Sequence, residues 1–298
     1  MKPDITIAIP TYQRSEILLN TVHEVLNQSY KNLELLVIDQ SIDLTPAALD
    51  ALKSIKDSRF RYTQVDPPSL TAARNFALQA ALAPIVLFLD DDVKLQKDMV
   101  AQHLKAFARH PQISAVGGRV MQTDFPVKRR VLKFDEYAVS HGVFTATEPG
   151  FTNAFPGGNH AIKVADALEV GGYDSRYYGN AFREESDMSL KLTRHGKKIY
   201  YEPGAELLHL ALHSGGLETR AKGHLYDSWA FYRNELFFTL RAVRLGKKLV
   251  ALRIKYREYC IVPSKRTRLK RSVYFLTGLL AGCWRICFGR RVVSRERI

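Results

Sequence analysis

Short apolar runs alternate with amphipathic stretches between residues 5 and 89 of this chain. The runs have the length of strands, and the stretches repeat apolar residues every three or four positions, as helices do. The sequence predicts strands at 5–9, 33–38, 59–63 and 85–89 and helices at 17–26, 46–55 and 70–82. This alternation is typical of a doubly wound, mostly parallel sheet of the α/β class, flanked by helices. Further along, helices are expected at 95–110, 187–194 and 224–245 and a strand at 198–201.

The positive charge of the chain is concentrated at its C-terminal end. The formal net charge is +14, and residues 247–298 hold 15 Lys or Arg against two acids, Glu258 and Glu296. That balance of +13 leaves about +1 for residues 1–246. We therefore expect a nearly neutral main domain at 1–246 and a basic, amphipathic helical tail at 247–298, which would be attracted to polyanions.

Within that tail, the basic cluster at residues 265–271 is followed by an apolar run at 273–284 that contains Trp284. The run is shorter than the roughly 20 residues of a membrane-spanning helix. Its composition predicts a helix that lies at an anionic membrane surface. The alternative is a solvated basic surface with a helix packed on the domain. Nucleic-acid binding is not expected, because the tail has no recognised reader motif and the rest of the chain is neutral.

The ends and the cysteines indicate a compartment. The apolar segment at residues 5–9 is too short for a secretory signal. Cys260, Cys283 and Cys287 form no CxxC pattern, so neither a disulfide framework nor a zinc site is expected. We expect a cytoplasmic protein, either free or peripheral on the cytoplasmic face of the membrane.

Polar residues follow the predicted strands where a ligand of such a sheet would bind. Pro10 and Thr11 end the first strand, Asp39 ends the second, and the fourth strand is followed by three consecutive carboxylates at residues 90–92. Adjacent carboxylates repel one another, and a divalent cation that bridges to a diphosphate would offset that repulsion. The alternative is that these acids cap the helix expected at 95–110.

A second acidic run, Glu184-Glu185-Ser186-Asp187, lies at an expected helix start. Such acids interact favourably with the positive end of the helix dipole. They also suit a general base, which an attacking sugar hydroxyl needs as it loses its proton. From the residues alone, both interpretations stay open.

Taken together, these motifs resemble the inverting nucleotide-sugar glycosyltransferases of family 2, which have the GT-A fold, over about residues 4–240. The motifs that carry the resemblance occur in the family's order: Ile9-Pro10-Thr11-Tyr12, Val37-Ile38-Asp39-Gln40-Ser41, Ala73-Arg74-Asn75, Leu89-Asp90-Asp91-Asp92 (the DxD motif), Gly157-Gly158-Asn159, Gly171-Gly172-Tyr173-Asp174 and Glu184-Glu185-Ser186-Asp187.

The resemblance implies a role for each matching residue. It implies metal binding by Asp92 and His209 with Mn²⁺ or Mg²⁺ as the cofactor, and it gives His213 a weaker claim. It implies Glu185 as the catalytic base, with Glu184 and Asp187 as fallbacks. The donor-binding residues it implies are Pro10, Thr11, Asp39, Arg74, Asn75, Asp90 and Asp91, and the acceptor-binding residues are Gly157, Gly158 and Asn159.

The expected function is therefore metal-dependent, inverting transfer of a hexosyl or deoxyhexosyl group from a nucleotide-diphosphate sugar. The expected acceptor is a hydroxyl of a saccharide or lipid-linked molecule in polysaccharide biosynthesis. The alternative is a non-catalytic protein that binds a nucleotide sugar or a polyanion and keeps the fold. Nucleotidyl transfer to a sugar phosphate is disfavoured, because residues 10–14 lack the glycines of a phosphate-binding loop.

Overall fold

The computed structural model describes residues 2–42, 46–123, 125–177, 179, 181–211, 226, 228–290, 293 and 295–296. Its helices are α1 (Ser15–Leu26), α2 (Pro46–Lys53), α3 (Leu70–Ala80), α4 (Met99–Arg109), α5 (Val164–Glu169), α6 (Glu184–Arg194), α7 (Trp229–Ala242), α8 (Lys248–Cys260) and α9 (Lys265–Phe288). Its strands are β1 (Ile5–Thr11), β2 (Leu33–Asp39), β3 (Phe60–Asp66), β4 (Ile85–Leu89), β5 (Val93–Leu95), β6 (Ile113–Met121), β7 (Lys133–Phe134), β8 (Ser140–His141), β9 (Gly150–Thr152), β10 (Asn159–Lys163), β11 (Lys198–His209) and β12 (Arg295–Glu296).

A single large sheet organises the molecule, with the strand order β12-β3-β2-β1-β4-β10-β6-β11-β5 and β9 paired to β11. β3, β2, β1 and β4 run parallel to one another, and β6 runs parallel to β11. β10 lies antiparallel between β4 and β6. The predicted mostly parallel α/β sheet is therefore confirmed, and the carboxyl ends of its main strands meet at one edge.

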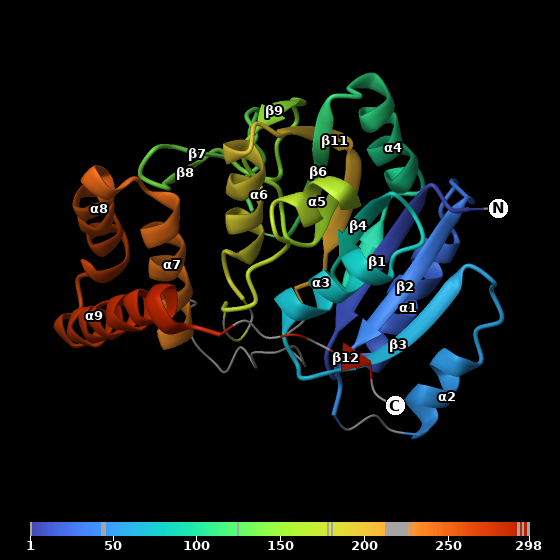
Figure 1. Cartoon of the computed structure of the whole chain (residues 1–298), viewed down its shortest axis with the longest axis horizontal. Helices are drawn as coiled ribbons and strands as arrows, with labels where there is room; N and C mark the ends of the chain where they lie inside the picture. Colours follow the sequence, from blue (N-terminus) through green and yellow to red (C-terminus); the bar gives the residue numbers. More distant parts are fainter. Residues whose placement is uncertain are drawn as a thin grey trace.

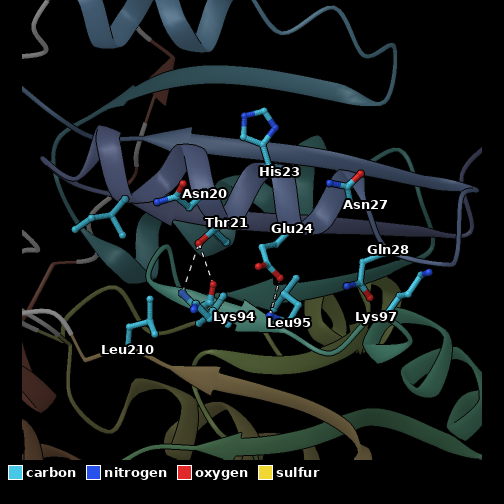
Figure 2. A pocket seen from close by; sticks show the side chains of 12 residues that line it. Asn20, Thr21, His23, Glu24, Asn27, Gln28, Lys94, Leu95, Lys97 and Leu210 are labelled. Atoms are coloured by element: carbon cyan, nitrogen blue, oxygen red, sulfur yellow. Dashed lines mark hydrogen bonds between the residues drawn. The ribbon is translucent and has the colours of Figure 1, made fainter.

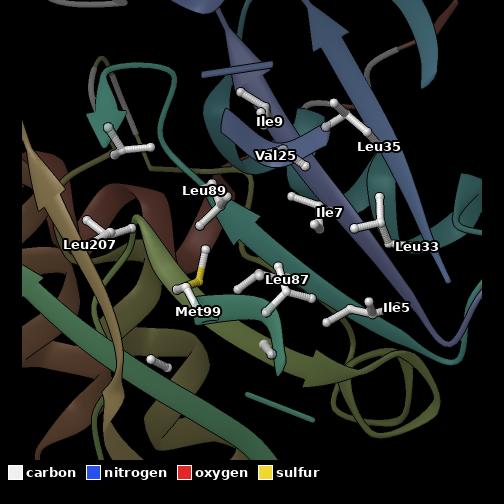
Figure 3. Packing of buried hydrophobic residues seen from close by; sticks show 14 of the residues in the cluster. Ile5, Ile7, Ile9, Val25, Leu33, Leu35, Leu87, Leu89, Met99 and Leu207 are labelled. Atoms are coloured by element: carbon white, nitrogen blue, oxygen red, sulfur yellow. The ribbon is translucent and has the colours of Figure 1, made fainter. Parts of the chain in front are cut away.

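Alternation along the strands builds a core on each face of the sheet. Ile5, Ile7 and Ile9 of β1 pack into one hydrophobic cluster, whereas Ala8 packs into a second cluster on the opposite face. Figure 3 shows the first cluster, where the isoleucines of β1 meet leucines of β2 and β4 and Met99 of α4. Since side chains of a strand point alternately to the two faces, strands that are apolar throughout need a cover on both.

Helices provide that cover on both sides of the sheet (Figure 1). α1 and α4 contribute residues to the first cluster, and α3, α5 and α6 contribute residues to the second. This arrangement is the doubly wound architecture that the alternating pattern predicts.

Several element boundaries differ from the expectation. The helix expected at 95–110 begins at Met99, since residues 93–95 form β5, and the strand expected at 59–63 extends to Asp66. α6 begins at Glu184 rather than 187, because the turn is made by Arg183, whose φ of 76° is left-handed. β11 extends to His209, past a register shift between Glu202 and Glu206. α7 begins at Trp229 rather than 224, and residues 224–225 lie outside the described residues.

The C-terminal helices α7, α8 and α9 lie together at one end of the molecule, away from β1 to β3 (Figure 1). A Cβ atom on Gly278 of α9 would lie 3.0 Å from the backbone nitrogen of Arg233, so glycine allows α9 and α7 to approach closely. Lys255 of α8 is buried and forms an ion pair with Glu235 of α7. Helices on both sides of residue 246 therefore pack on one another, and one face of α9 is buried there. The division of the chain at residue 246 stays a prediction.

Candidate active site

The carboxyl end of β4 carries the acidic run, and β11 brings a histidine to it. His209 Nε2 lies 3.1 Å from Asp92 Oδ1 and 3.8 Å from Asp90 Oδ2. One ligand atom from each of these three residues lies within 4.8 Å of the others. Carboxylate oxygens and an imidazole nitrogen in such a group fit a divalent cation such as Mn²⁺ or Mg²⁺. Asp92 and His209, which were predicted to bind the metal, therefore lie close together, and Asp90, which was predicted to bind the donor, lies beside them.

The middle carboxylate of the run faces away from this group. Asp91 accepts hydrogen bonds from Thr11 Oγ1 at 2.7 Å and from Arg14 Nη1 at 3.0 Å. Burial raises the pKa of Asp91 to about 6, against the opposing effects of Thr11 and Arg14. Arg14 Nη1 also lies 3.4 Å from Asp92 Oδ2, so this guanidinium offsets part of the negative charge of the run.

The loop before β10 joins the acidic run to α6. A Cβ on Gly158 would lie 2.1 Å from Asp90 Oδ2, so only glycine leaves space for that carboxylate. A Cβ on its neighbour Gly157 would meet Glu185 Cγ at 3.8 Å and Glu184 Oε1 at 3.9 Å. The glycine pair therefore lies between a possible metal ligand on one side and Arg74 with the acids of α6 on the other.

The three acids of α6 have different surroundings. Glu184 is buried, and Arg74 Nη1 lies 3.2 Å from its Oε1. Burial raises the pKa of Glu184 to about 8, although Arg74 opposes this shift. Asp187 pairs with Arg241 at 3.1 Å. Glu185 is partly exposed and accepts a hydrogen bond from Ser186 Oγ at 2.8 Å.

The position of α6 is fixed from the C-terminal helices. Arg183, which precedes the acidic run, donates to Glu235 of α7 at 2.6 Å, and Lys255 of α8 lies 2.8 Å from the other oxygen of the same carboxylate. The start of α6 and helix α8 therefore both contact the same buried carboxylate of α7. Since removing one partner of a buried ion pair leaves charge uncompensated, this cluster resists displacement of the helix that carries Glu185.

Three other predicted residues, Arg74, Asn75 and Asn159, have partners within the protein, and their contact with donor or acceptor stays a prediction. Arg74 is buried between Glu184 and the rings of Phe88 and Tyr173. Asn75 exchanges two hydrogen bonds of 2.8 Å with the backbone of Tyr173. Asn159 is fully buried, and its amide nitrogen donates to the carbonyl oxygens of Arg119 and Ala205. The asparagine side chains thus hold backbone segments, and Arg74 holds Glu184.

The end of β2 is also internally bonded. Asp39 is buried, its Oδ1 accepts from the backbone nitrogen of Ser41, and its Oδ2 accepts from Tyr62 Oη, both at 2.8 Å. Pro10 pairs with Ile38 in the neighbouring strand, which places it at the same edge of the sheet as Asp39. Contact of Pro10 and Asp39 with a nucleotide stays a prediction. His213 lies outside the described residues.

A cavity of about 740 Å³ lies beside the acidic run, between α1 and β5. Figure 2 shows Thr21 and Glu24 pointing from α1 toward β5. Thr21 Oγ1 donates to the backbone oxygen of Asp91, and Glu24 accepts from the backbone nitrogen of Leu95. These two side chains thus pair with backbone groups at the edge of the sheet. Asp90 and Asp92 are not among the residues that line the cavity.

Sequence analysis missed three residues of this site. Arg14 lies in the turn after β1, a strand end where a polar residue could have been marked. Gln122, whose Oε1 lies 3.3 Å from His209 Nδ1, follows β6 in a region that the pattern left unassigned. Arg241 lies in an aromatic helix far along the chain, and its sequence carries no signal that it pairs with Asp187.

A family model and several known proteins match this chain. Residues 6–164 match the model of glycosyl transferase family 2. The chain is 35% identical over 106 residues to a putative teichuronic acid biosynthesis glycosyltransferase, TuaG, of Bacillus subtilis, covering 35% of this chain and 42% of that protein. It is 26% identical over 202 residues to a poly-beta-1,6-N-acetyl-D-glucosamine synthase of Staphylococcus aureus, covering 67% of this chain and 48% of that protein. The chain thus spans less than half the length of these curated relatives.

Two solved structures share the fold at 17% sequence identity. One is a mannosyltransferase of Pyrobaculum calidifontis in complex with GDP-Man and Mn²⁺, with a TM-score of 0.58 over 98% of this chain and 89% of that one. The other is GalNAc-T7 with UDP, GalNAc and Mn²⁺, with a TM-score of 0.65 over 95% of this chain and 57% of that one. The family match covers more than half of the chain, and the sheet matches in architecture, so this protein belongs to glycosyl transferase family 2 and has the GT-A fold.

Proposed function

We propose that this protein is a metal-dependent glycosyltransferase that moves a hexosyl or deoxyhexosyl group from a nucleotide-diphosphate sugar to an acceptor hydroxyl, with inversion. The observation that carries this proposal is the Gly157-Gly158 pair. A Cβ on Gly158 would collide with Asp90 in the group of possible metal ligands, and a Cβ on Gly157 would lie 3.6–3.9 Å from Arg74, Glu185 and Glu184. In one displacement reaction, a cation on one side of this dipeptide can stabilise the leaving group, and a carboxylate on the other side can accept the proton of the attacking hydroxyl.

Asp90, Asp92 and His209 would hold the cation on the donor side. When bound, the cation supplies Lewis-acid stabilisation of the negative charge that develops on the departing diphosphate. His209 Nδ1 lies 3.3 Å from Gln122 Oε1, which favours donation from Nδ1 and leaves Nε2 as the ligand atom. Arg14 holds Asp91 and partly offsets the charge of Asp92, so the carboxylates can lie close together before any donor binds.

Glu185 would accept the proton of the attacking hydroxyl on the other side. Glu184 is occupied by Arg74 and Asp187 by Arg241, whereas Glu185 is partly exposed beside the glycine loop. A base on the face opposite the leaving group directs the attack from that face. A single displacement of that kind inverts the anomeric centre and needs no covalent intermediate.

The relatives support the substrate class. The two structures with the same fold were solved with GDP-Man or with UDP and GalNAc, each with Mn²⁺. The two curated relatives are named for teichuronic acid biosynthesis and for synthesis of a poly-N-acetylglucosamine. We therefore propose a saccharide or lipid-linked acceptor in polysaccharide biosynthesis.

The test is a screen of nucleotide sugars for metal-dependent release of the nucleoside diphosphate, with Mn²⁺ or Mg²⁺ and with chelator as the control. A donor that turns over is then used with saccharide acceptors, and the anomeric configuration of the product is read by NMR. We expect chelator-sensitive turnover and an inverted product. Tight donor binding with no turnover for any donor and acceptor would instead support the non-catalytic alternative, and a retained configuration would exclude the single displacement.

A further inference from the structure

Helix α9 exposes an apolar stripe along one face. Leu269, Val273, Leu276, Leu280 and Trp284 follow one another at intervals of three or four residues, and their exposed fractions are 69%, 48%, 60%, 71% and 58%. This spacing places them on one side of the helix. We call these five residues the outer stripe. A run of large apolar side chains at such exposure marks an interaction surface rather than scattered surface leucines.

The opposite face of α9 fixes how the outer stripe points. Arg271, Phe275, Gly278 and Gly282 recur at the same intervals and are the buried residues of this helix. Gly278 and Gly282 allow close contact with the backbone of α7, and Arg271 donates to the carbonyl oxygen of Tyr259. Because one face is packed, α9 cannot rotate to bury the outer stripe against its own domain.

The C-terminal end of α9 is tied to the acceptor side of the candidate active site. Arg176 and Arg285 exchange hydrogen bonds through their guanidinium groups and backbone oxygens, at 3.1 and 2.8 Å. Arg176 also pairs with Asp174, and Arg241 bridges Asp174 to Asp187 of α6. The outer stripe is therefore held in a fixed position relative to the helix that carries Glu185.

Positive charge surrounds the outer stripe. Lys265, Arg266, Arg268 and Lys270 are exposed at the N-terminal end of α9, and Arg290 is exposed just beyond its C-terminal end. The helix itself contains no acidic residue. A groove of about 380 Å³ beside Trp284 is lined by Trp229, Arg233, Ala281 and Arg285, which adds a second tryptophan and two guanidinium groups. A partner for this face must therefore be apolar and anionic at once.

We propose that the outer stripe and its basic border dock this protein on the surface of an anionic phospholipid bilayer. The apolar side chains would enter the boundary between headgroups and acyl chains, the basic residues would face lipid phosphates, and Trp284 would lie at headgroup level. Among the helices of the described residues, none combines the length and the hydropathy that a membrane-crossing segment needs. Because the outer stripe occupies one side of α9, the contact would be with one face of the bilayer, and it would hold the acceptor side of the active site at a fixed height above lipid.

The proposal is tested by co-sedimentation of the full chain with vesicles of neutral phosphatidylcholine alone or mixed with an anionic phospholipid, without any sugar donor. The result is therefore independent of the proposed transferase activity. We expect binding to the anionic vesicles that weakens as salt rises, because screening removes the electrostatic part and leaves the apolar part. Equal binding to neutral and anionic vesicles, or no binding to either at low salt, would overturn the proposal.

Matched variants separate the two parts of the surface. Leu276→Ser with Leu280→Ser should reduce partitioning into anionic vesicles roughly tenfold, since each leucine contributes apolar area. Arg266→Gln with Lys270→Gln should reduce it roughly 30-fold at low salt and little at high salt. Lys53→Gln with Lys105→Gln, two exposed lysines of α2 and α4, is the charge-matched control and should change partitioning little.

A second copy of this chain is the competing occupant of the outer stripe. In that case the parent protein would be a dimer without vesicles, the leucine variant would be a monomer by light scattering, and no variant would change sedimentation with vesicles. That combination would overturn the proposal. Since all substituted side chains are exposed, thermal unfolding should be unchanged in every variant, which guards against loss of binding through misfolding.

Discussion

Two short acidic runs, residues 90–92 after β4 and residues 184–187 at the start of α6, look alike in the sequence, yet the fold gives them different neighbours. At the first run, Asp90 and Asp92 face each other and His209, with Arg14 as a cation that contacts Asp91 and Asp92. At the second run, the flanking acids each have their own arginine.

The difference lies in which charges are already neutralised. Ligand atoms that converge without enough positive charge among them attract a cation, which is why the first run suits a metal. In the second run Glu184 is buried against Arg74 and Asp187 pairs with Arg241, and within the described residues no ion pair to Glu185 is found. A lone carboxylate beside a loop that ligands can approach suits a base. The same composition therefore supports two chemistries, and each of the following experiments tests that contrast.

The largest effect is expected for Asp92→Asn, which should lower metal-dependent turnover roughly 10³-fold or more. An amide is a poor substitute for a carboxylate as ligand to a hard cation, and the Lewis-acid contribution amounts to several kcal/mol. Turnover is measured against Mn²⁺ concentration for parent and variant. An unchanged metal dependence in the variant would show that the first run does not hold the cation.

Glu185→Gln should lower kcat roughly 10²–10⁴-fold, the usual contribution of a general base. Glutamine keeps the shape of the side chain but cannot accept the proton. Donor affinity should stay close to that of the parent, because the substitution lies on the acceptor side of Gly157. Calorimetry of donor binding together with kcat distinguishes the two effects. Loss of donor affinity with unchanged kcat would remove Glu185 from the role of base.

The sequence carried enough information for the fold because the strands are periodic and apolar on both faces. Ile5, Ile7 and Ile9 alternate with Thr6 and Ala8, and that pattern alone fixes a two-sided sheet. The predicted strand ends then indicated where the acids of the first run lie, because the carboxyl ends of parallel strands meet at one edge of a sheet. His209 lies at the same edge, at the end of β11.

Partners far apart in the chain could not be predicted from the sequence. Arg14 and Asp91 are 77 residues apart, and Arg241 and Asp187 are 54 apart. Which arginine meets which acid depends on tertiary packing, and no local periodicity encodes it. For the same reason the sequence did not predict that Asn75 and Asn159 donate hydrogen bonds to the backbone of the protein.

The glycine loop between the two runs allows a smaller test with its own control. Gly158→Ala should reduce activity roughly 10–100-fold, because the added methyl group would displace Asp90, and misplacing a metal ligand has effects of that order. Gly157→Ala adds the same methyl group at ordinary contact distances and should leave metal affinity close to that of the parent. Comparable loss of Mn²⁺ affinity in both variants would mean that the loop is sensitive as a whole and that Gly158 has no special relation to Asp90.

The smallest effect on activity is expected for Asp187→Asn, which tests whether the second run contains one base or several. Asp187 is buried against Arg241, and that guanidinium keeps Asp174 as a second partner at 2.9 Å after the substitution. The variant should therefore lose about 2 kcal/mol of unfolding free energy, which lies in the range for a hydrogen bond to a charged group. The unfolding temperature should fall by a few degrees.

Measured below that temperature, kcat of Asp187→Asn should fall far less than that of Glu185→Gln, because Asp187 neutralises Arg241 and is not open to the acceptor. If kcat instead falls as far as in Glu185→Gln while the unfolding temperature is unchanged, the proton acceptor is Asp187, and the pairing with Arg241 must open when the acceptor binds.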